Sequence, residues 1–307
     1  MGKLGKELLE GRYHRIYLLA HLIDQIAAHR FAYLQDLEAI FADQGIYPYL
    51  PAFQKESAVH RFAGSVLWQY YYDKETLVAS AIQKFPGASI ADENMWVLPV
   101  EAACEAYEIE YPTFVEFRKE SNLSEVTPAA QRHFRSCDDH RCTECARLSD
   151  EYLDYWNELN LCGYVDDLLD RTSEEVFFVM FSNRSFLANL HGLLSGYVQD
   201  AAYSEEPEIQ KLFEHTRAGS KLKRATPPAW AKRAVEFRDR GRCVYCHRQL
   251  GTLHTPINHA NFDHIIPLAQ GGLNDVTNLQ LLCDVCNNKK RHKGTEPGRL
   301  YERWYPA

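Results

Sequence analysis

Apolar side chains recur along the first two thirds of the chain at the spacing of a buried helix face. Over residues 7–41 they follow one another at intervals of three and four positions, the period of an α-helix with one face in a core. Gly45 and the prolines that follow it end this segment. Similar patterns predict further helices over residues 56–84, 98–109, 149–160, 174–199 and 206–216. We therefore expect residues 1–216 to form a mainly α-helical domain.

A different pattern begins after residue 216. Residues 217–229 are small, basic and proline-containing, with almost nothing to bury, which predicts a linker. The elements predicted beyond it are a helix, two strands and a terminal helix, at 229–239, 261–266, 279–282 and 284–293. Gly271 and Gly272 indicate a loop between the two strands. Residues 230–307 are therefore expected to form a small α+β domain.

Composition excludes several classes of protein. With 46% hydrophobic and 25% charged side chains, the 307 residues are typical of a globular chain and unlike collagen or disordered proteins. No apolar run reaches the roughly 18 residues that a membrane span needs, and the chain does not open on a secretory signal pattern. We expect a cytoplasmic protein without a membrane partner.

The net charge of −8 argues against a nucleic-acid partner until its distribution is considered. Residues 1–216 carry 18 Lys and Arg against 35 Asp and Glu, a balance of −17, whereas residues 217–307 carry 16 against 7, a balance of +9. This asymmetry predicts different partners for the two parts. The basic part suits a phosphate backbone, and the acidic part is expected to bind a protein partner or a small-molecule signal instead.

Four of the nine cysteines form two CxxC pairs in the basic part, Cys243 with Cys246 and Cys283 with Cys286. In a reducing compartment, clustered cysteines are more often metal ligands than disulfides. Two such pairs can place four thiolates at the corners of a tetrahedron, the closed geometry of a structural Zn²⁺ site. The alternative, four unrelated buried cysteines, is disfavoured because both pairs lie in one short domain. A zinc ion would also stabilise a domain with so small a core.

A second group of cysteines lies in the acidic part. Cys137, Cys142 and Cys145, together with either His133 or His140, could bind a second zinc ion. A single CxxC pair without a distant partner pair is a weaker signal than the first group. Packing of these cysteines in a helical core and redox sensing are the competing interpretations.

The residues between the zinc pairs carry the most specific motifs of the chain. They read DHIIPL at 263–268, GG at 271–272, NLQLLC at 278–283 and CxxCN at 283–287. Together these motifs resemble the HNH endonuclease family, a ββα-metal fold with zinc knuckles, over about residues 230–293. The resemblance implies metal-dependent cleavage of DNA, with catalytic Mg²⁺ or Mn²⁺ and structural Zn²⁺. Residues 1–216 resemble no family that we can name.

Two neighbouring residues supply the chemistry that phosphodiester hydrolysis requires. A histidine that is neutral near pH 7 can accept a proton from water, and a carboxylate is a hard ligand suited to magnesium. Asp263 and His264 are adjacent on a predicted strand, so their side chains point to opposite faces. The resemblance assigns the catalytic metal to Asp263 and the role of general base to His264.

The remaining family positions are both asparagines. Asn278 matches the middle letter of the HNH motif, and its amide is expected to hold the loop and orient the ring of His264. Asn287 stands where the third letter is usually histidine. An amide oxygen can bind a hard cation, and this HNN variant also occurs in active members, so we predict Asn287 as the second metal ligand. The substitution also fits a degenerate domain that keeps zinc and has lost cleavage, an alternative that the presence of Asp263, His264 and Asn278 disfavours.

Basic side chains cluster beside the motif. Those predicted to clamp backbone phosphates from the terminal helix are Lys289, Lys290, Arg291 and Lys293. Lys221, Lys223, Arg224, Lys232 and Arg233 could extend this track. Runs of charged residues usually lie on a surface that faces only solvent. These basic residues directly follow the motif, which favours a contact with phosphate instead.

The sequence therefore predicts a DNA endonuclease whose acidic helical domain regulates it or binds a partner. Opposite charges suggest that the acidic domain holds the basic domain inactive, and the modular arrangement is analogous to restriction or antiviral defence effectors. Two other functions remain open. One is a non-catalytic, zinc-stapled nucleic-acid-binding module, and the other is an interaction protein that acts through its helical domain.

Overall fold

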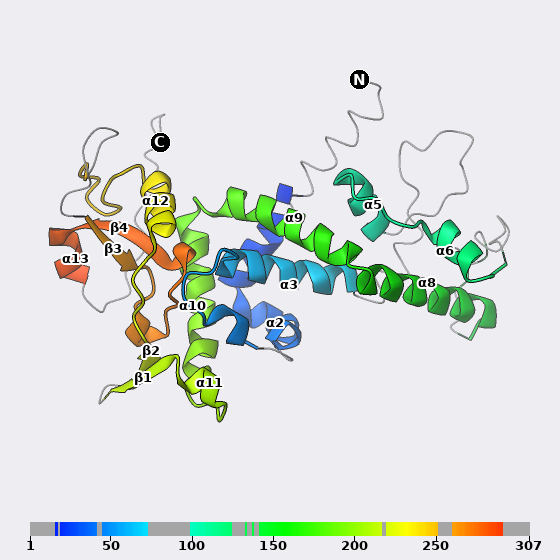
Figure 1. The fold of residues 1–307 in the computed structure, drawn as a ribbon, viewed down its shortest axis with the longest axis horizontal. Coiled ribbons are helices and arrows are strands. Elements are labelled where there is room, and N and C mark those ends of the chain that lie inside the picture. The colour runs from blue at the N-terminus through cyan, green and yellow to red at the C-terminus, as the bar shows by residue number, and fades with distance from the viewer. Residues whose placement is uncertain are drawn as a thin grey trace, which may run out of the picture. The chain divides into compact units, whose positions relative to one another are not determined.

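The computed structural model describes residues 16–17, 19–41, 45–72, 99–124, 133, 137, 141–216, 219–250 and 260–290 (Figure 1). Most of them are helical, and two small antiparallel sheets lie in the C-terminal third. A membrane-spanning helix would need greater length and apolarity than any helix among these residues has.

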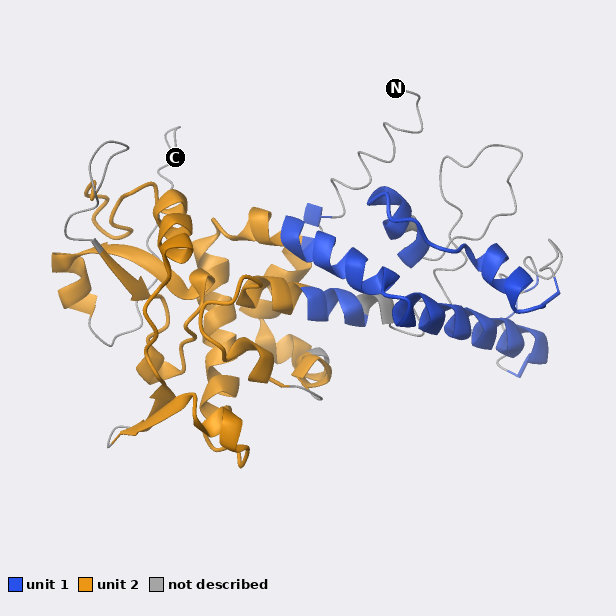
Figure 2. Cartoon of the chain, viewed as in Figure 1, with its two compact units in different colours: residues 1–19, 64–175 blue, residues 20–63, 176–307 orange. Residues whose placement is uncertain are grey.

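The chain divides into two compact units (Figure 2). Unit 1 comprises residues 1–19 and 64–175, and unit 2 comprises residues 20–63 and 176–307. The division differs from the boundary that the sequence suggested near residue 217, because residues 20–63 and 176–216 belong to the same unit as the C-terminal segment.

Unit 1 is helical. Among its described residues, the helices with defined bounds are α5 (Pro99–Ala106), α6 (Phe114–Glu120) and α8 (Thr143–Leu161), together with parts of α3 (Ala58–Tyr72) and α9 (Tyr164–Met180). The periodicity did not predict α6, which is short and begins at a capping box between Thr113 and Glu116. Phe114 stacks on Tyr152 with the ring centroids 4.2 Å apart, which joins α6 to α8.

Unit 2 begins with helical segments that the sequence joined into longer ones. The helix expected over 7–41 is interrupted at residue 29, followed by η1 (Arg30–Tyr33) and α2 (Leu34–Phe41). The helix expected over 174–199 is two helices, α9 and α10 (Arg184–Ala201). The side chain of Asn183 accepts a hydrogen bond from the backbone N–H of Phe186 at 3.1 Å and so starts α10. η2 (Tyr47–Tyr49) and α11 (Pro207–Gln210) are short.

A β-hairpin replaces the end of one predicted helix and part of the predicted linker. β1 (Phe213–Thr216) pairs antiparallel with β2 (Gly219–Leu222), and Leu222 is buried. The prediction of a helix to residue 216 is therefore wrong beyond Gln210. The sequence of residues 219–222 does not indicate a strand, because Leu222 is the only apolar side chain among them. The pairing with β1 depends on backbone hydrogen bonds, which leave no pattern in the side chains.

The C-terminal part of unit 2 has the predicted order of helix, strand, strand and helix. α12 (Ala229–Arg238) precedes β3 (Ala260–His264), which pairs antiparallel with β4 (Leu279–Cys283), and α13 (Asp284–Lys290) follows directly. Two short 3₁₀ turns, η4 (Leu268–Gln270) and η5 (Val276–Asn278), lie between the strands. The part of the predicted terminal helix after residue 290 lies outside the described residues.

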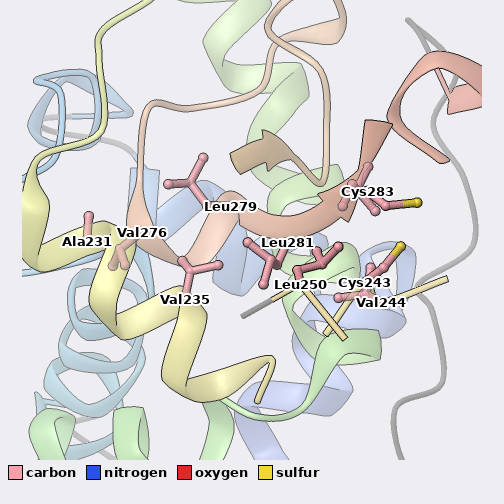
Figure 3. Packing of buried hydrophobic residues seen from close by; sticks show 10 residues of the cluster. Ala231, Val235, Cys243, Val244, Leu250, Val276, Leu279, Leu281 and Cys283 are labelled. Carbon is pink, nitrogen blue, oxygen red and sulfur yellow. The ribbon is translucent and has the colours of Figure 1, made fainter. Parts of the chain in front are cut away.

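A small apolar core holds these elements together (Figure 3). It joins α12, β4 and the chain around Val244. Its buried residues are Ala231, Val235, Cys243, Val244, Leu250, Val276, Leu279, Leu281, Leu282 and Cys283. The sulfur atoms of the two cysteines extend from one side of this cluster (Figure 3). The core therefore positions the metal-binding thiols.

Candidate active site and metal centres

The four cysteines of the C-terminal part meet at one point. The sulfur atoms of Cys243, Cys246, Cys283 and Cys286 all lie within 4.8 Å of one another, and those of Cys246 and Cys283 are 3.7 Å apart. The backbone N–H of Cys286 points at Cys283 Sγ at 3.4 Å. Burial favours the thiol form of Cys243, but backbone N–H groups outweigh it and lower its pKa to about 7. This geometry and chemistry fit a structural zinc ion.

The pair Asp263 and His264 ends β3, at the opposite end of the β3–β4 ladder from Cys283, which pairs with Ala260. In the register of the sheet, Asp263 lies opposite Gln280 and His264 lies opposite Leu279. Because successive residues of a strand face opposite sides, the carboxylate and the imidazole point away from each other. The two residues therefore lie where the sequence placed them, on the two faces of a single strand.

Lys290 reaches Asp263 from α13. Its ammonium nitrogen lies 2.6 Å from Asp263 Oδ2 and also donates to the backbone carbonyl of His264. Only 3% of Lys290 is exposed, so this residue neutralises Asp263 instead of reaching a DNA phosphate as the sequence predicted. Gln280 Nε2 is 3.4 Å from the same carboxylate oxygen. Within the described part of the chain, these contacts leave Asp263 Oδ1 available.

Asn287 lies one helical turn before Lys290 on α13. Residues three positions apart lie on the same side of a helix. Asn287 therefore lies on the side of α13 that faces β3, as Lys290 does. An amide oxygen and a carboxylate oxygen form a donor set that suits a hard divalent cation such as Mg²⁺ or Mn²⁺. The residues present therefore fit the catalytic metal that the family resemblance implies.

The ring of His264 is buried. The residue is 2% exposed, and neither ring nitrogen forms a hydrogen bond of standard geometry, although the side chain of Asn274 interacts with the ring. Burial, followed by the positive charge of Arg224, lowers the pKa of His264 to about 4. The imidazole is therefore neutral at pH 7, the state that a proton acceptor requires.

Asn278 holds the loop between the strands. Its Nδ2 donates to the carbonyl oxygens of Ile266 at 3.0 Å and Leu273 at 2.8 Å, and its Oδ1 accepts from the N–H of Ile266 at 2.9 Å. The side chain is fully buried. Its hydrogen bonds go to the backbone of the loop and not to the ring of His264 as the sequence suggested, so it fixes the chain that follows His264.

α10 covers the same loop, which the sequence did not indicate. His191 Nε2 lies 2.8 Å from Thr277 Oγ1, and Gln199 Nε2 donates to the carbonyl of Gln270 at 3.0 Å. A Cβ atom at Gly271 would lie 2.4 Å from the carbonyl oxygen of Ser195, so helix and loop backbones are in direct contact. Residues 271–283 are all buried as a result.

The N-terminus of α3 is tied to this loop as well. Asp275 Oδ2 accepts from the N–H of Ala58 at 3.0 Å, and Oδ1 accepts from the N–H of Thr277 at 2.8 Å. The N–H of Phe53 donates to the carbonyl of Asn274 at 2.8 Å. Burial raises the pKa of Asp275, and these hydrogen bonds oppose the effect.

A buried ion pair also joins α10 to the end of α12. Arg184 Nη2 donates to Asp239 Oδ1 at 2.8 Å, and Arg238 binds both oxygens of the same carboxylate. Asp239 Oδ2 also accepts from the N–H of Leu281 in β4 at 2.8 Å. Asp239 is completely buried. Nothing in the spacing of Arg184 or His191 along the sequence pointed to these contacts, which join segments far apart in the chain.

The second cysteine group of the sequence is also brought together, in unit 1. Ligand atoms of His133, Cys137, Cys142 and Cys145 all lie within 4.8 Å of one another. His133 Nε2 is 3.2 Å from Cys142 Sγ, and this contact is the main reason why the pKa of Cys142 falls to about 6. His140, the other histidine considered from sequence, lies outside the described residues.

The basic residues predicted to bind DNA are distributed differently. Lys289 is exposed on α13, whereas Arg291 and Lys293 lie outside the described residues. Of the residues that could extend the track, Lys221 pairs with Glu214 at 3.1 Å and Lys223 donates to the carbonyl of Lys211 at 2.7 Å. Arg224 contributes its charge to the surroundings of His264.

Comparison with known proteins identifies the C-terminal part alone. Residues 243–297 match the family described as HNH endonuclease, and this segment contains the Cys₄ centre together with Asp263, His264, Asn278 and Asn287. No curated protein and no solved structure matches the chain.

Proposed function

We propose that this protein is a metal-dependent endonuclease that hydrolyses DNA phosphodiester bonds at the HNH site of residues 243–297. The observation that carries the proposal is a buried, neutral imidazole at His264, adjacent on β3 to the carboxylate of Asp263, in a segment that also holds the Cys₄ centre. A proton acceptor and a hard metal ligand fixed on one strand are the minimum that hydrolysis of a phosphodiester needs.

Each residue has a distinct role in the proposed reaction. A ring nitrogen of His264 accepts the proton of the attacking water, and its low pKa keeps that nitrogen free at pH 7. Asn278 fixes the loop that follows the base. Lys290 balances the charge of Asp263 and holds the carbonyl of His264, which sets the end of β3. Asp263 and Asn287 would hold Mg²⁺ or Mn²⁺, which supplies charge stabilisation at the scissile phosphate.

Exposed basic side chains would bind the DNA backbone near this site. Lys289 is on the surface of α13, and we propose that Arg291 and Lys293 continue its positive charge. Phosphate contacts of this kind orient a duplex without reading its sequence. We therefore assign no base specificity to the site.

Cleavage of plasmid and of single-stranded DNA by the full chain tests the proposal. We expect nicking with Mg²⁺ or Mn²⁺ and none with chelator. His264→Ala should lower the rate by at least about 10²-fold, because general base catalysis contributes that much, while the zinc content stays unchanged. His215→Ala, which removes an exposed imidazole of the same unit, serves as the control. Cleavage by His264→Ala at the rate of the unaltered chain would contradict the assigned role.

One observation favours a second candidate, a zinc-stapled module that binds nucleic acid without cutting it. Lys290 occupies one oxygen of Asp263, and His264 is 2% exposed, so the imidazole is shielded from solvent in this structure. The same assay separates the two functions. A chain that shifts DNA in a gel and contains zinc, but cleaves under no metal condition, would be the binding module.

We further propose that the acidic part of the chain regulates the nuclease or binds a partner. Unit 1 carries 25 Asp and Glu against 13 Lys and Arg, a net charge of −12, whereas unit 2 carries +4. Such a charge repels duplex DNA and favours a basic protein or a cationic signal. A defence or restriction role is proposed by analogy only. A reducing compartment such as the cytoplasm would keep the cysteine thiols available.

A further inference from the structure

A second metal-like centre lies in unit 1 and shares no residue with the site assigned to DNA cleavage. It consists of His133 and Cys137, which precede α8, and of Cys142 and Cys145 at the start of that helix. The three cysteines are free thiols, partly buried, and the histidine is exposed. Its four ligand atoms lie within 4.8 Å of one another, as do those of the Cys₄ centre.

The two centres repeat one local arrangement. Cys142 is the N-cap of α8 and Cys145 is its third residue, just as Cys283 precedes α13 and Cys286 is the third residue of α13. In each case the backbone N–H of the second cysteine points at the sulfur of the first. A CxxC pair wound onto the first turn of a helix in this way presents two sulfurs to one ion, and N–H groups stabilise the thiolate.

The remaining two ligands come from the chain before the helix. His133 Nε2 lies 3.2 Å from Cys142 Sγ, so the imidazole already faces the sulfur pair. In a tetrahedral zinc site with Zn–S near 2.3 Å and Zn–N near 2.0 Å, ligand atoms are separated by roughly 3.5–3.8 Å. A group that is already within 4.8 Å needs only a small contraction to reach this geometry.

We propose that His133, Cys137, Cys142 and Cys145 bind a second zinc ion that fastens the chain preceding α8 to the start of this helix. Four protein ligands fill a tetrahedral shell, which makes the site structural and leaves no position for substrate. Binding replaces the thiol protons by zinc–sulfur bonds and releases them to solvent, without any change of oxidation state.

The location indicates what the ion stabilises. α8 carries the aromatic contacts of unit 1, with Phe114 of α6 stacked on Tyr152, and Tyr155 donating to Glu101 at 2.9 Å and to the carbonyl of Pro112 at 2.7 Å. Arg118 of α6 also pairs with Glu151 of α8. An ion at the first turn of α8 would therefore stabilise the end of the helix around which unit 1 is packed.

Metal analysis of the purified full chain tests the proposal independently of any nuclease activity. We expect about two zinc ions per chain, decreasing to about one in Cys145→Ser and in Cys142→Ser. Cys162→Ser, which removes an exposed thiol at the other end of α8, should keep about two. A content of one zinc in the unaltered chain, or an unchanged content in both ligand variants, would overturn the proposal.

A ligand exchange separates metal binding from a general loss of folding. His133→Cys creates a four-cysteine shell and should retain two zinc ions, whereas His133→Ala should lose one or bind it much more weakly. In the cobalt-substituted protein, the sulfur-to-metal absorption should decrease by roughly a third to a half in Cys145→Ser and remain unchanged in Cys162→Ser. Equal zinc content in His133→Ala and His133→Cys would exclude the histidine as a ligand and overturn the four-residue site.

Discussion

At the scale of single residues, the histidines of unit 2 show how burial determines chemistry. His191 and His264 are both about 1–2% exposed. Burial, followed by the proximity of the His264 ring and by the charge of Arg238, lowers the pKa of His191 to about 3, and burial also lowers that of His264 to about 4. His264 could be recognised from its motif, but His191 could not. A lone histidine on a helix carries no signal that it will lie against a loop 80 residues further along the chain.

The buried state of His191 predicts a pH dependence of stability. Because the folded-state pKa is below the unfolded value near 6.5, folding disfavours the protonated ring. The free energy of unfolding is then unaffected by this group above pH 6.5 and falls as the pH decreases from 6.5 toward about 3. Between pH 7 and pH 5 the loss from His191 alone is about 2 kcal/mol, at about 1.4 kcal/mol per pH unit.

Urea denaturation of His191→Gln at pH 7 and pH 5 measures this effect. The amide stays neutral and can still bond to Thr277, so the variant should lose about 2 kcal/mol less than the unaltered chain over this interval. His215→Gln replaces an exposed ring and controls for the loss of an imidazole as such. Equal pH dependence in His191→Gln and the unaltered chain would show that His191 is not held neutral by the fold.

At the scale of elements, periodicity located helices better than it located their ends. It predicted α5 within one residue at its N-terminus, but it joined α9 and α10, because the three residues between them contain neither glycine nor proline. The helix–strand–strand–helix order of the C-terminal part was predicted correctly. The hairpin β1–β2 was not, since a four-residue strand with one buried side chain leaves almost no apolar pattern.

The loop between β3 and β4 depends on α10 in a way that only the structure shows. Gly271 has a φ of +83°, and a Cβ there would meet the backbone oxygen of Ser195 at 2.4 Å. Gly163 has the same φ of +83° with nothing within 4 Å of the corresponding position. The two glycines therefore share the left-handed backbone conformation and differ in the close approach of a helix.

This pair separates backbone strain from the clash. Gly163→Ala should lower the free energy of unfolding by about 1–2 kcal/mol, the cost of the left-handed conformation for a side chain. Gly271→Ala should lower it by a further 1–3 kcal/mol or so, because backbone cannot yield as a side chain can. Chemical denaturation of both variants provides the comparison. Equal losses would show that α10 does not approach the loop closely in solution.

At the scale of the whole molecule, the charge asymmetry seen in the sequence persists, but it divides unit 1 from unit 2 and not residues 1–216 from residues 217–307. The sequence contrasted residues 1–216 at −17 with residues 217–307 at +9, whereas the compact units carry −12 and +4. The difference arises because residues 20–63 and 176–216, which are acidic, belong to unit 2. Composition along a chain cannot show which distant segments pack together, so the apparent linker suggested a boundary inside a compact unit.

This division changes the expected result of removing residues 1–216. An acidic domain that merely blocked the nuclease would leave a more active fragment on deletion. In the structure, however, the deletion removes α10, whose Arg184 pairs with the buried Asp239 and whose His191 meets Thr277. Leaving a buried charge without a partner costs about 3–5 kcal/mol, and because Arg238 still pairs with Asp239 the loss of Arg184 costs at most about that much, against the roughly 5–15 kcal/mol that stabilises a whole domain. The deletion would also uncover the part of the loop that α10 contacts, at Gln270, Gly271 and Thr277.

We therefore expect the fragment 217–307 to be unfolded or aggregated, even when zinc is supplied. Circular dichroism should show no cooperative unfolding, and DNA cleavage should be lost and not enhanced. A fragment of residues 176–307 keeps α10 and should recover part of the cooperative transition, because the contacts of Arg184, His191 and Gln199 are restored. Cooperative unfolding of 217–307 with bound zinc and undiminished cleavage would show that the HNH domain folds independently of α10. Only a fragment that cleaves faster than the full chain would support inhibition of the nuclease by the acidic residues 1–216.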